Sequence, residues 1–359
     1  GHASFDGTSV NLGFANGDTI KLGSFSSSTT GTTELSEDDS TLISGTVQAT
    51  AIRMVSTGSI TNAAASSVKV AGNASFNGSS LSLGFANNDT VQLGSFSSTT
   101  TGATKLSEDD STFLSGTVQA ASLNVVSTGA ISNAPAATVK IAGNASFSGT
   151  SLNLGFANND TVQLGSFSSN TTGATDLSED DGTLISGTVS AASLTIVSAG
   201  SISNAANAAV SITGHAAFSG SSLNLGFANN DSVTLGSFSS TTTGATNLSE
   251  NDGTLISGTV QAASLNLIST GTISNSAAST VSVSGNASFD GTNISIGFAT
   301  NDVVTLGSFS ANTPGTASLS EDDSTSIEGM VQAASLNIVS AGSITNAAAS
   351  TVSITGNAS

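Results

Sequence analysis

Apolar and polar residues alternate over short stretches of the chain. Leu152-Asn153-Leu154, Val162-Gln163-Leu164 and Val210-Ser211-Ile212 are three such stretches. Alternation with a period of two is typical of β-strands, because successive side chains of a strand point to opposite faces. Turn-forming Gly, Asn and Ser residues separate the stretches. The pattern therefore predicts an all-β protein built from short strands.

The strand pattern recurs with a fixed period of 71 residues. The motif G-[NH]-A-[SA]-F begins at Gly1, Gly72, Gly143, Gly214 and Gly285, and no insertion or deletion separates the copies. The repeats are thus residues 1–71, 72–142, 143–213, 214–284 and 285–355, followed by the start of a sixth copy at 356–359. A strict register without linkers indicates copies that stack directly on one another, as in a solenoid.

Each repeat divides further into three parts, which in the third repeat are residues 143–165, 166–191 and 192–213. Each part contains about three short strands, and its length matches one coil of a parallel β-helix, whose coils stack about 4.8 Å apart. We predict a right-handed parallel β-helix, or β-solenoid, with about three coils per 71-residue repeat and one continuous solenoid through all copies. A string of small antiparallel β-sandwiches is the alternative, but it leaves the three-part division unexplained.

Fifteen of the 16 phenylalanines occupy three fixed positions per repeat, which in the first repeat are Phe5, Phe14 and Phe25. In the predicted solenoid, Phe5 and Phe25 begin successive coils and Ile52 begins the third. Apolar residues stacked at one coil position form a ladder that buries surface inside a thin solenoid. We therefore predict that all three phenylalanine positions pack in the core.

Composition narrows the classes of function. The chain has 24 acidic and 5 basic residues, a net charge of -19, and no Lys or Arg after Lys140. Binding to nucleic acid requires Lys and Arg side chains opposite the phosphates, so the composition excludes it. No apolar run approaches the roughly 18 residues of a membrane-spanning helix, so we expect no membrane span. The absence of cysteine excludes a disulfide framework.

Two acidic positions recur in every repeat and are the candidates for a metal site. The first is the Asp of F-A-[NT]-[NG]-D, and the second is the last Asp of S-E-[DN]-D. Aligning residues 162–164 with 184–186 places Asp160 almost directly below Asp181, where two carboxylates repel unless they are solvated, protonated or bridged by a cation. Oxygen ligands suit Ca²⁺. The candidate Ca²⁺ ligands are Asp18, Asp39, Asp89, Asp110, Asp160, Asp181, Asp231, Asp252, Asp302 and Asp323; a solvated acidic turn without metal is the alternative.

The repetition of these acids argues against catalysis. A glycosidase-type acid and base form one asymmetric constellation, whereas here the same acids recur in every repeat. No Lys, Arg or Tyr stands beside them in the later repeats. We therefore expect no enzymatic activity, no catalytic residue and no cofactor apart from the Ca²⁺ discussed above.

The repeat units resemble those of very large bacterial surface proteins. Segments reading L-G-S-F, G-A-T, L-S-E-D-D and L-I-S-G-T-V-Q-A-A-S-L-N are similar to the β-strand repeats of the filamentous-haemagglutinin and autotransporter-passenger group, and the resemblance covers the whole chain. It implies secretion to the cell surface or the extracellular space, a right-handed parallel β-helix shaft, and a role in adhesion, aggregation or fibre formation.

These observations together predict the structural shaft of an extracellular bacterial fibre or adhesin. Its expected partners are further copies of itself, joined end to end or laterally. The alternative is an adhesion module whose repeated face binds cell-surface or matrix carbohydrate, or another surface.

Overall fold

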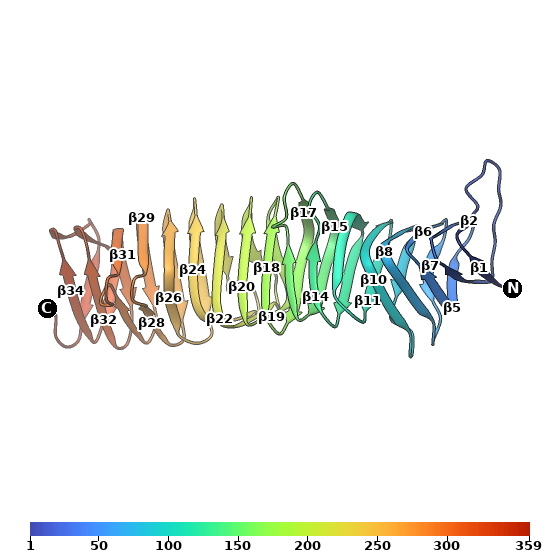
Figure 1. Ribbon diagram of the computed structural model, residues 1–359. Helices are drawn as coiled ribbons and strands as arrows, with labels where there is room; N and C mark the ends of the chain where they lie inside the picture. Colours follow the sequence, from blue (N-terminus) through green and yellow to red (C-terminus); the bar gives the residue numbers. More distant parts are fainter. The chain divides into compact units, whose positions relative to one another are not determined.

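The computed structural model describes residues 1–359 as two compact units, Gly1–Asp180 and Asp181–Ser359. Both units consist of strands and the turns between them. No helix of the structure has the length and apolar character needed to cross a membrane. Figure 1 shows the strands of each unit following one another as successive rungs, coloured blue to green in the first unit and green to red in the second.

The first unit contains strands β1 (His2–Gly7), β2 (Val10–Leu12), β3 (Ser24–Thr29), β4 (Thr32–Glu37), β5 (Thr41–Ala49), β6 (Ala51–Ser56), β7 (Ser59–Asn62), β8 (Ser67–Gly78), β9 (Ser80–Leu83), β10 (Thr90–Thr100), β11 (Ala103–Glu108), β12 (Thr112–Ala120), β13 (Ser122–Ser127), β14 (Ala130–Asn133), β15 (Thr138–Gly149), β16 (Ser151–Leu154), β17 (Thr161–Thr171) and β18 (Ala174–Glu179).

The second unit contains β19 (Thr183–Ala191), β20 (Ser193–Ser198), β21 (Ser201–Asn204), β22 (Ala209–Gly220), β23 (Ser222–Leu225), β24 (Ser232–Thr242), β25 (Ala245–Glu250), β26 (Thr254–Ala262), β27 (Ser264–Ser269), β28 (Thr272–Asn275), β29 (Thr280–Asp290), β30 (Asn293–Ile296), β31 (Val303–Asn312), β32 (Thr316–Glu321), β33 (Thr325–Ala333), β34 (Ser335–Ser340), β35 (Ile344–Asn346) and β36 (Thr351–Ile354).

The strands pair in parallel within each unit. In the first unit, β1 pairs with β3, β3 with β5, and β5 with β7 and β8, all in parallel. In the second unit, β22 pairs with β24, β24 with β26, and β26 with β28 and β29, again in parallel. Each strand therefore lies on a strand from the preceding coil, and the predicted all-β parallel β-solenoid is confirmed.

Stacked positions in the first unit show how long one coil is. The stack runs from Val10 through Thr33, Ile52, Ala74 and Phe96 to Leu114 in β12, and continues from Thr112 of the same strand through Ile131 to Leu152. Leu152 lies seven coils beyond Val10 and is its equivalent two repeats along the chain. In the second unit, Ile202 and Ile344 are also equivalent residues two repeats apart. Seven successive pairings between neighbouring coils join them.

One coil therefore contains about 20 residues, and one repeat makes three and a half coils. This refines the predicted number of about three. At a strand spacing of about 4.8 Å, each repeat advances the solenoid by about 17 Å.

Consecutive repeats consequently lie half a turn apart within a unit. Leu81 is the equivalent of Val10 one repeat along the chain, yet it belongs to a second stack, in which it pairs with Ile60 below and Thr104 above. Only after two repeats does an equivalent residue, Leu152, return to the stack of Val10. The same motif therefore faces opposite sides of the solenoid in neighbouring repeats.

Phenylalanine pairs fill the interior of the coils. The ring centroids of Phe5 and Phe25 are 5.9 Å apart, and those of Phe76 and Phe96 are 6.1 Å apart. Both distances lie within the range of favourable aromatic pairs. Phe5 and Phe25 lie on successive coils with their rings in contact, as predicted, but they are not at one register position, since Phe25 pairs with Ala3 and Phe5 with Ser27. The predicted third member of the ladder, Ile52, is wrong. Phe25 pairs with Ile43 on the next coil, whereas Ile52 pairs with Ala74 and lies in the ladder of Phe96, because the half-turn between repeats moves the ladder to the other stack.

Alternating burial explains why these segments form strands. In β9, Leu81 and Leu83 are buried and the intervening serine is only partly buried. Burying such a side chain stabilises the fold by roughly 1.5–3 kcal/mol relative to an exposed one. The strand ends at Leu83, and the next residue, Gly84, has a φ of 80°, which glycine adopts at little cost because it has no Cβ. A Cβ there would lie 2.0 Å from the Ser107 carbonyl oxygen, so the next coil approaches the backbone closely at this corner.

Candidate functional site

The aspartates of the F-A-[NT]-[NG]-D motif hold a surface loop to the preceding coil. In the second repeat, Asp89 Oδ2 accepts hydrogen bonds from Ala86 N at 2.9 Å and from Asn62 Nδ2 at 2.7 Å. Asn62 Oδ1 in turn accepts one from Gly84 N at 3.0 Å. The same clamp recurs at Asp160, Asp231 and Asp302, and Asp18 Oδ2 accepts from Ala15 N. These carboxylates fix the conformation of the loop.

The second group of aspartates occupies a turn whose backbone is tied to the next coil. The Asp110 carbonyl oxygen accepts hydrogen bonds from Ser127 Oγ at 2.5 Å and from Gly129 N at 3.1 Å. Equivalent bonds reach the carbonyl oxygens of Asp39, Asp181, Asp252 and Asp323. Burial, helped by the charge of Asp109, raises the pKa of the Asp110 carboxyl. This turn therefore belongs to the stacking of the coils.

The alignment that placed one group of aspartates directly below the other is wrong. In the second repeat, the next coil meets Val91 with the acidic turn itself: Asp109 N donates to Val91 O, and Val91 N donates to Asp109 Oδ2 at 2.8 Å. The alignment had placed the segment around Leu114 over this strand. Leu114 instead pairs with Phe96, because the chain completes the turn before it returns to a strand.

The structure shows the surroundings of the predicted calcium ligands. It contains no group of three or more His, Cys, Asp or Glu side chains that could hold a metal ion. The loop aspartates bond to their own loop, as Asp89 does, and the carbonyl oxygens of the turn aspartates accept protein hydrogen bonds, as in Asp110. Calcium binding therefore stays a prediction.

A buried glutamate in every repeat is the feature that the sequence reasoning missed. Glu37, Glu108, Glu179, Glu250 and Glu321 are each 2–3% exposed. Glu108 Oε1 accepts a hydrogen bond from Leu93 N at 2.8 Å, and burial raises the pKa of Glu108 to about 7. Burial likewise raises the pKa of Glu250 to about 7. The signal lay in the alternation, since Glu108 follows the buried Leu106 by two residues and so points to the same inner face.

The buried glutamates face a threonine four residues further along. Thr41 Oγ1 donates to Glu37 Oε2 at 2.6 Å, and the matching bond in the fifth repeat measures 2.7 Å. At Glu108, the hydrogen bonds from Thr112 and from Leu93 N lower the pKa, but burial of the carboxyl outweighs both. Burying an ionised carboxylate that is only partly hydrogen-bonded costs free energy, so the protonated acid is favoured there.

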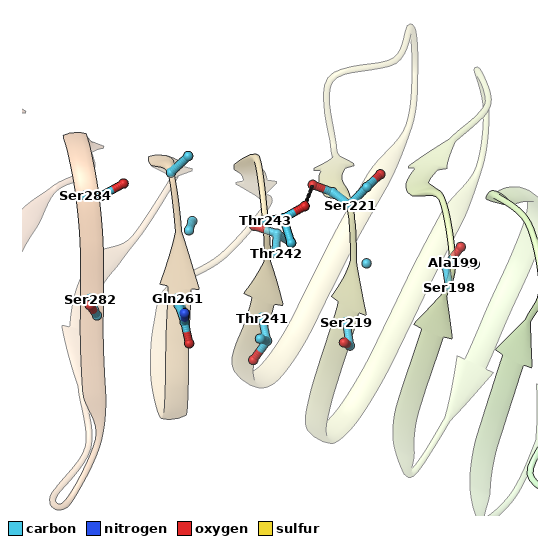
Figure 2. Close-up of a pocket in the computed structure, with 13 residues that line it drawn as sticks. Ser198, Ala199, Ser219, Ser221, Thr241, Thr242, Thr243, Gln261, Ser282 and Ser284 are labelled. Carbon is cyan, nitrogen blue, oxygen red and sulfur yellow. Dashed lines mark hydrogen bonds between the residues drawn. The ribbon is translucent and has the colours of Figure 1, made fainter.

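A polar groove crosses several coils of the second unit. It has a volume of about 600 Å³ and is lined by Ser, Thr, Ala, Gly and a single Gln. Ser219, Thr241, Gln261 and Ser282 form one row, in which each residue pairs with the next on the following coil. Figure 2 shows a second row beside it, where Thr243 Oγ1 donates to the Ser221 carbonyl oxygen at 3.3 Å. The groove therefore presents hydroxyl and amide groups at the spacing of the strands.

The same row recurs in the first unit with a positive charge. Gln48, Lys69 and Gln92 pair across successive coils and line a groove of about 530 Å³, which also includes Asp110. Lys69 occupies the position that Ser282 occupies in the second unit. The row is thus a repeated surface feature whose charge differs between repeats.

The phenylalanine of each surface loop was predicted to lie in the core, and the structure shows that it does not. Phe85 is 46% exposed, and its equivalents Phe156, Phe227 and Phe298 are also exposed. The loop turns outward after Gly84, which carries the ring away from the stacked strands. In the first repeat, the Arg53 guanidinium lies 4.4 Å from the centre of the Phe14 ring, a cation–π contact.

Comparisons with protein-family models, with curated protein sequences and with solved structures found no match to this chain. The function is therefore inferred from its own residues and their geometry.

Proposed function

We propose that the chain is a segment of the structural shaft of an extracellular bacterial fibre or adhesin. The observation that carries the proposal is the seven-coil stack that joins equivalent residues two repeats apart, from Val10 to Leu152. Because each repeat contacts only its neighbours and all have the same length, further repeats extend the stack without any change of design. The length of the solenoid then depends only on the number of repeats, as a shaft requires.

The roles of the acidic residues support a structural function over a catalytic one. The Asp89 carboxylate clamps a loop, and the Asp110 carbonyl oxygen joins two coils. Both arrangements recur in other repeats, whereas a catalytic constellation is formed once. We therefore expect no turnover of oligosaccharide substrates by the chain.

The axial period of the native material tests the proposal of a shaft. Electron microscopy and fibre diffraction should show elongated particles with a period of about 17 Å for each repeat and about 34 Å for each pair of repeats. Compact particles without such a period would contradict the proposal.

Immunogold labelling of intact source cells tests the proposed location. A structural shaft of a fibre or adhesin should be labelled outside the cell envelope without permeabilisation. Labelling that appears only after permeabilisation would refute the extracellular assignment, although it would leave the solenoid itself untouched.

A second function, binding of neutral carbohydrate by the repeated face, is favoured by the polar groove of the second unit. Its lining supplies hydroxyl and amide groups and no charged side chain. A glycan array probed with the full chain tests this function. Thr241→Ala and Gln261→Ala should weaken any binding found, while Asn266→Ala, outside the groove, should leave it unchanged. Absence of binding to every neutral glycan would remove this candidate and leave the shaft.

A further inference from the structure

The chain contains two Asn-Gly sequences, and the structure places them in different settings. Asn16-Gly17 lies in the surface loop of the first repeat, between β2 and β3. Asn77-Gly78 forms the end of strand β8. Asparagine followed by glycine is the sequence in which an asparagine side chain is attacked most readily by the next backbone nitrogen, because glycine has no side chain to obstruct the approach. The two sites therefore form a natural comparison.

Asn16 and Gly17 are the central residues of a tight turn. The Asp18 N–H donates to the Ala15 carbonyl oxygen at 3.3 Å, and Ala15 N–H donates to Asp18 Oδ2 at 3.0 Å. The hydrogen bond that closes the turn is thus donated by Asp18, not by Gly17. Asn16 is exposed, Gly17 has a φ of 82°, and no atom lies within 4 Å of the place where a Cβ of Gly17 would be.

Asn77, by contrast, is held in a strand with a neighbour on either side. It pairs with Val55 on the preceding coil and with Thr99 on the next, and Gly78 pairs with Thr100. Pairing on both sides keeps this backbone extended and restrains the nitrogen of Gly78 from moving toward the side chain of Asn77. Cyclisation there would require the pairing with both neighbours to open.

We propose that Asn16 is a site of spontaneous deamidation, and that Asn77 is protected from it by the fold. The deprotonated Gly17 nitrogen attacks Cγ of Asn16, a bond from Gly17 N to Cγ forms, and the Cγ–Nδ2 bond breaks with release of ammonia. Water then opens the resulting succinimide at either carbonyl, which gives aspartate or isoaspartate. Each event adds one negative charge to the loop and requires only water as co-reactant.

The site is confined to the first repeat because the other repeats carry asparagine in the place of Gly17. These residues are Asn88, Asn159, Asn230 and Asn301, and they adopt φ values of 56–58°. Their Cβ atoms stand next to the nitrogen that would attack. Moreover, in the second repeat the Asn87 carbonyl oxygen accepts a hydrogen bond from Ala65 N, which fixes the loop to the preceding coil. Gly17→Asn therefore restores the residue of the other repeats and removes the reactive sequence.

Peptide mass spectrometry of the full folded chain, aged in mildly alkaline buffer, tests the proposal. The peptide containing Asn16 should gain the mass that replaces an amide NH₂ by OH, roughly tenfold faster than the peptide containing Asn77, because order in the strand suppresses opening. Gly17→Asn should abolish the conversion of Asn16 and leave Asn77 unchanged. The chain unfolded in urea serves as the reference, in which both sites should convert at similar rates.

Two results would overturn the proposal. One is conversion of Asn77 in the folded chain as fast as that of Asn16. The other is no conversion of Asn16 in the folded chain under conditions that convert it in the unfolded reference, since the turn would then block the attack.

Discussion

Protonation of the buried glutamates should make the solenoid more stable in mild acid than at neutral pH. Burial raises the pKa of Glu108 from 4.5 to about 7 in the folded chain. The folded chain therefore holds a proton, between these two values, that the unfolded chain has already released. Since the folded state binds more protons in this window, the free energy of unfolding falls as pH rises from about 4.5 to about 7. Below and above the window, this group leaves the stability independent of pH.

The size of the effect follows from the width of the window. Integrated between pH 5 and pH 7.5, the difference in bound protons amounts to about 2 kcal/mol for Glu108. Strands β10, β12 and β13, which pack around the strand of Glu108, carry no charged side chain that would oppose the rise in its pKa. The nearest charges, Asp109 and Asp110, are negative and raise the pKa further. Glu250 should contribute an effect of similar size in the second unit.

Urea unfolding followed by circular dichroism at the two pH values measures the effect. The wild-type chain should unfold at higher urea at pH 5, and Glu108→Gln should reduce the difference between the two pH values by about 2 kcal/mol. The amide keeps an acceptor for Leu93 N and should leave the chain no less stable than wild type at pH 7.5. Asp6→Asn removes an equal charge from an exposed site and should keep the wild-type difference. A wild-type stability that is flat or rises with pH, or a Glu108→Gln chain that is strongly destabilised at pH 7.5, would refute the reasoning.

Three further pairs of substitutions should separate structural roles by thermal or urea unfolding. Phe96→Ala, at a fully buried ring, should cost about 3–5 kcal/mol, whereas Phe85→Ala, at a ring that is 46% exposed, should cost less than about 1 kcal/mol; equal losses would contradict the stacked core. Gly17→Ala should cost roughly 1–2 kcal/mol, because alanine is strained in the left-handed backbone conformation of that residue. Gly84→Ala should cost more, because its Cβ would also meet a carbonyl oxygen at 2.0 Å. Asp109→Asn should change stability by less than about 0.5 kcal/mol, because the fourth repeat has asparagine in this position with the same backbone bond, while Asp109→Ala should cost about 1–3 kcal/mol.

The strands and their stacking could be predicted from the sequence because both depend on local, repeated signals. Alternation in segments such as Leu81-Ser82-Leu83 specifies a strand with one buried face, and the unbroken period requires repeats that pack on one another. The half-turn between repeats could not be predicted in the same way. Strand signals mark where the chain is extended, but they do not mark which side of the coil it has reached. Leu114 thus resembles the partner of Gln92 in sequence and pairs with Phe96 in the structure.

The acidic residues show a second limit of sequence reasoning. Aspartate in a turn and aspartate in a metal site have the same sequence signature, and Asp89 is distinguished only by the loop N–H groups that its carboxylate accepts. Charged residues are almost always exposed, so the residue type of Glu108 by itself predicts an exposed side chain. Its position two residues after Leu106 outweighs that tendency, since the strand carries the side chain inward whatever its charge. The cost of burial then appears as a raised pKa.

The half-turn between repeats also bears on the choice between shaft and binding module. Within the first unit, the exposed loops of Phe14 and Phe156 lie on one side, seven coils or about 34 Å apart, and the loop of Phe85 lies on the other. Every surface feature that occurs once per repeat is therefore divided between two sides. A planar partner reaches only one side and so meets every second repeat, which halves the number of contacts available for multivalent binding. A shaft suffers no such loss, because its stacking contacts lie inside the coil and are the same for odd and even repeats. The geometry thus favours a chain selected for continuous stacking over one selected for a binding face.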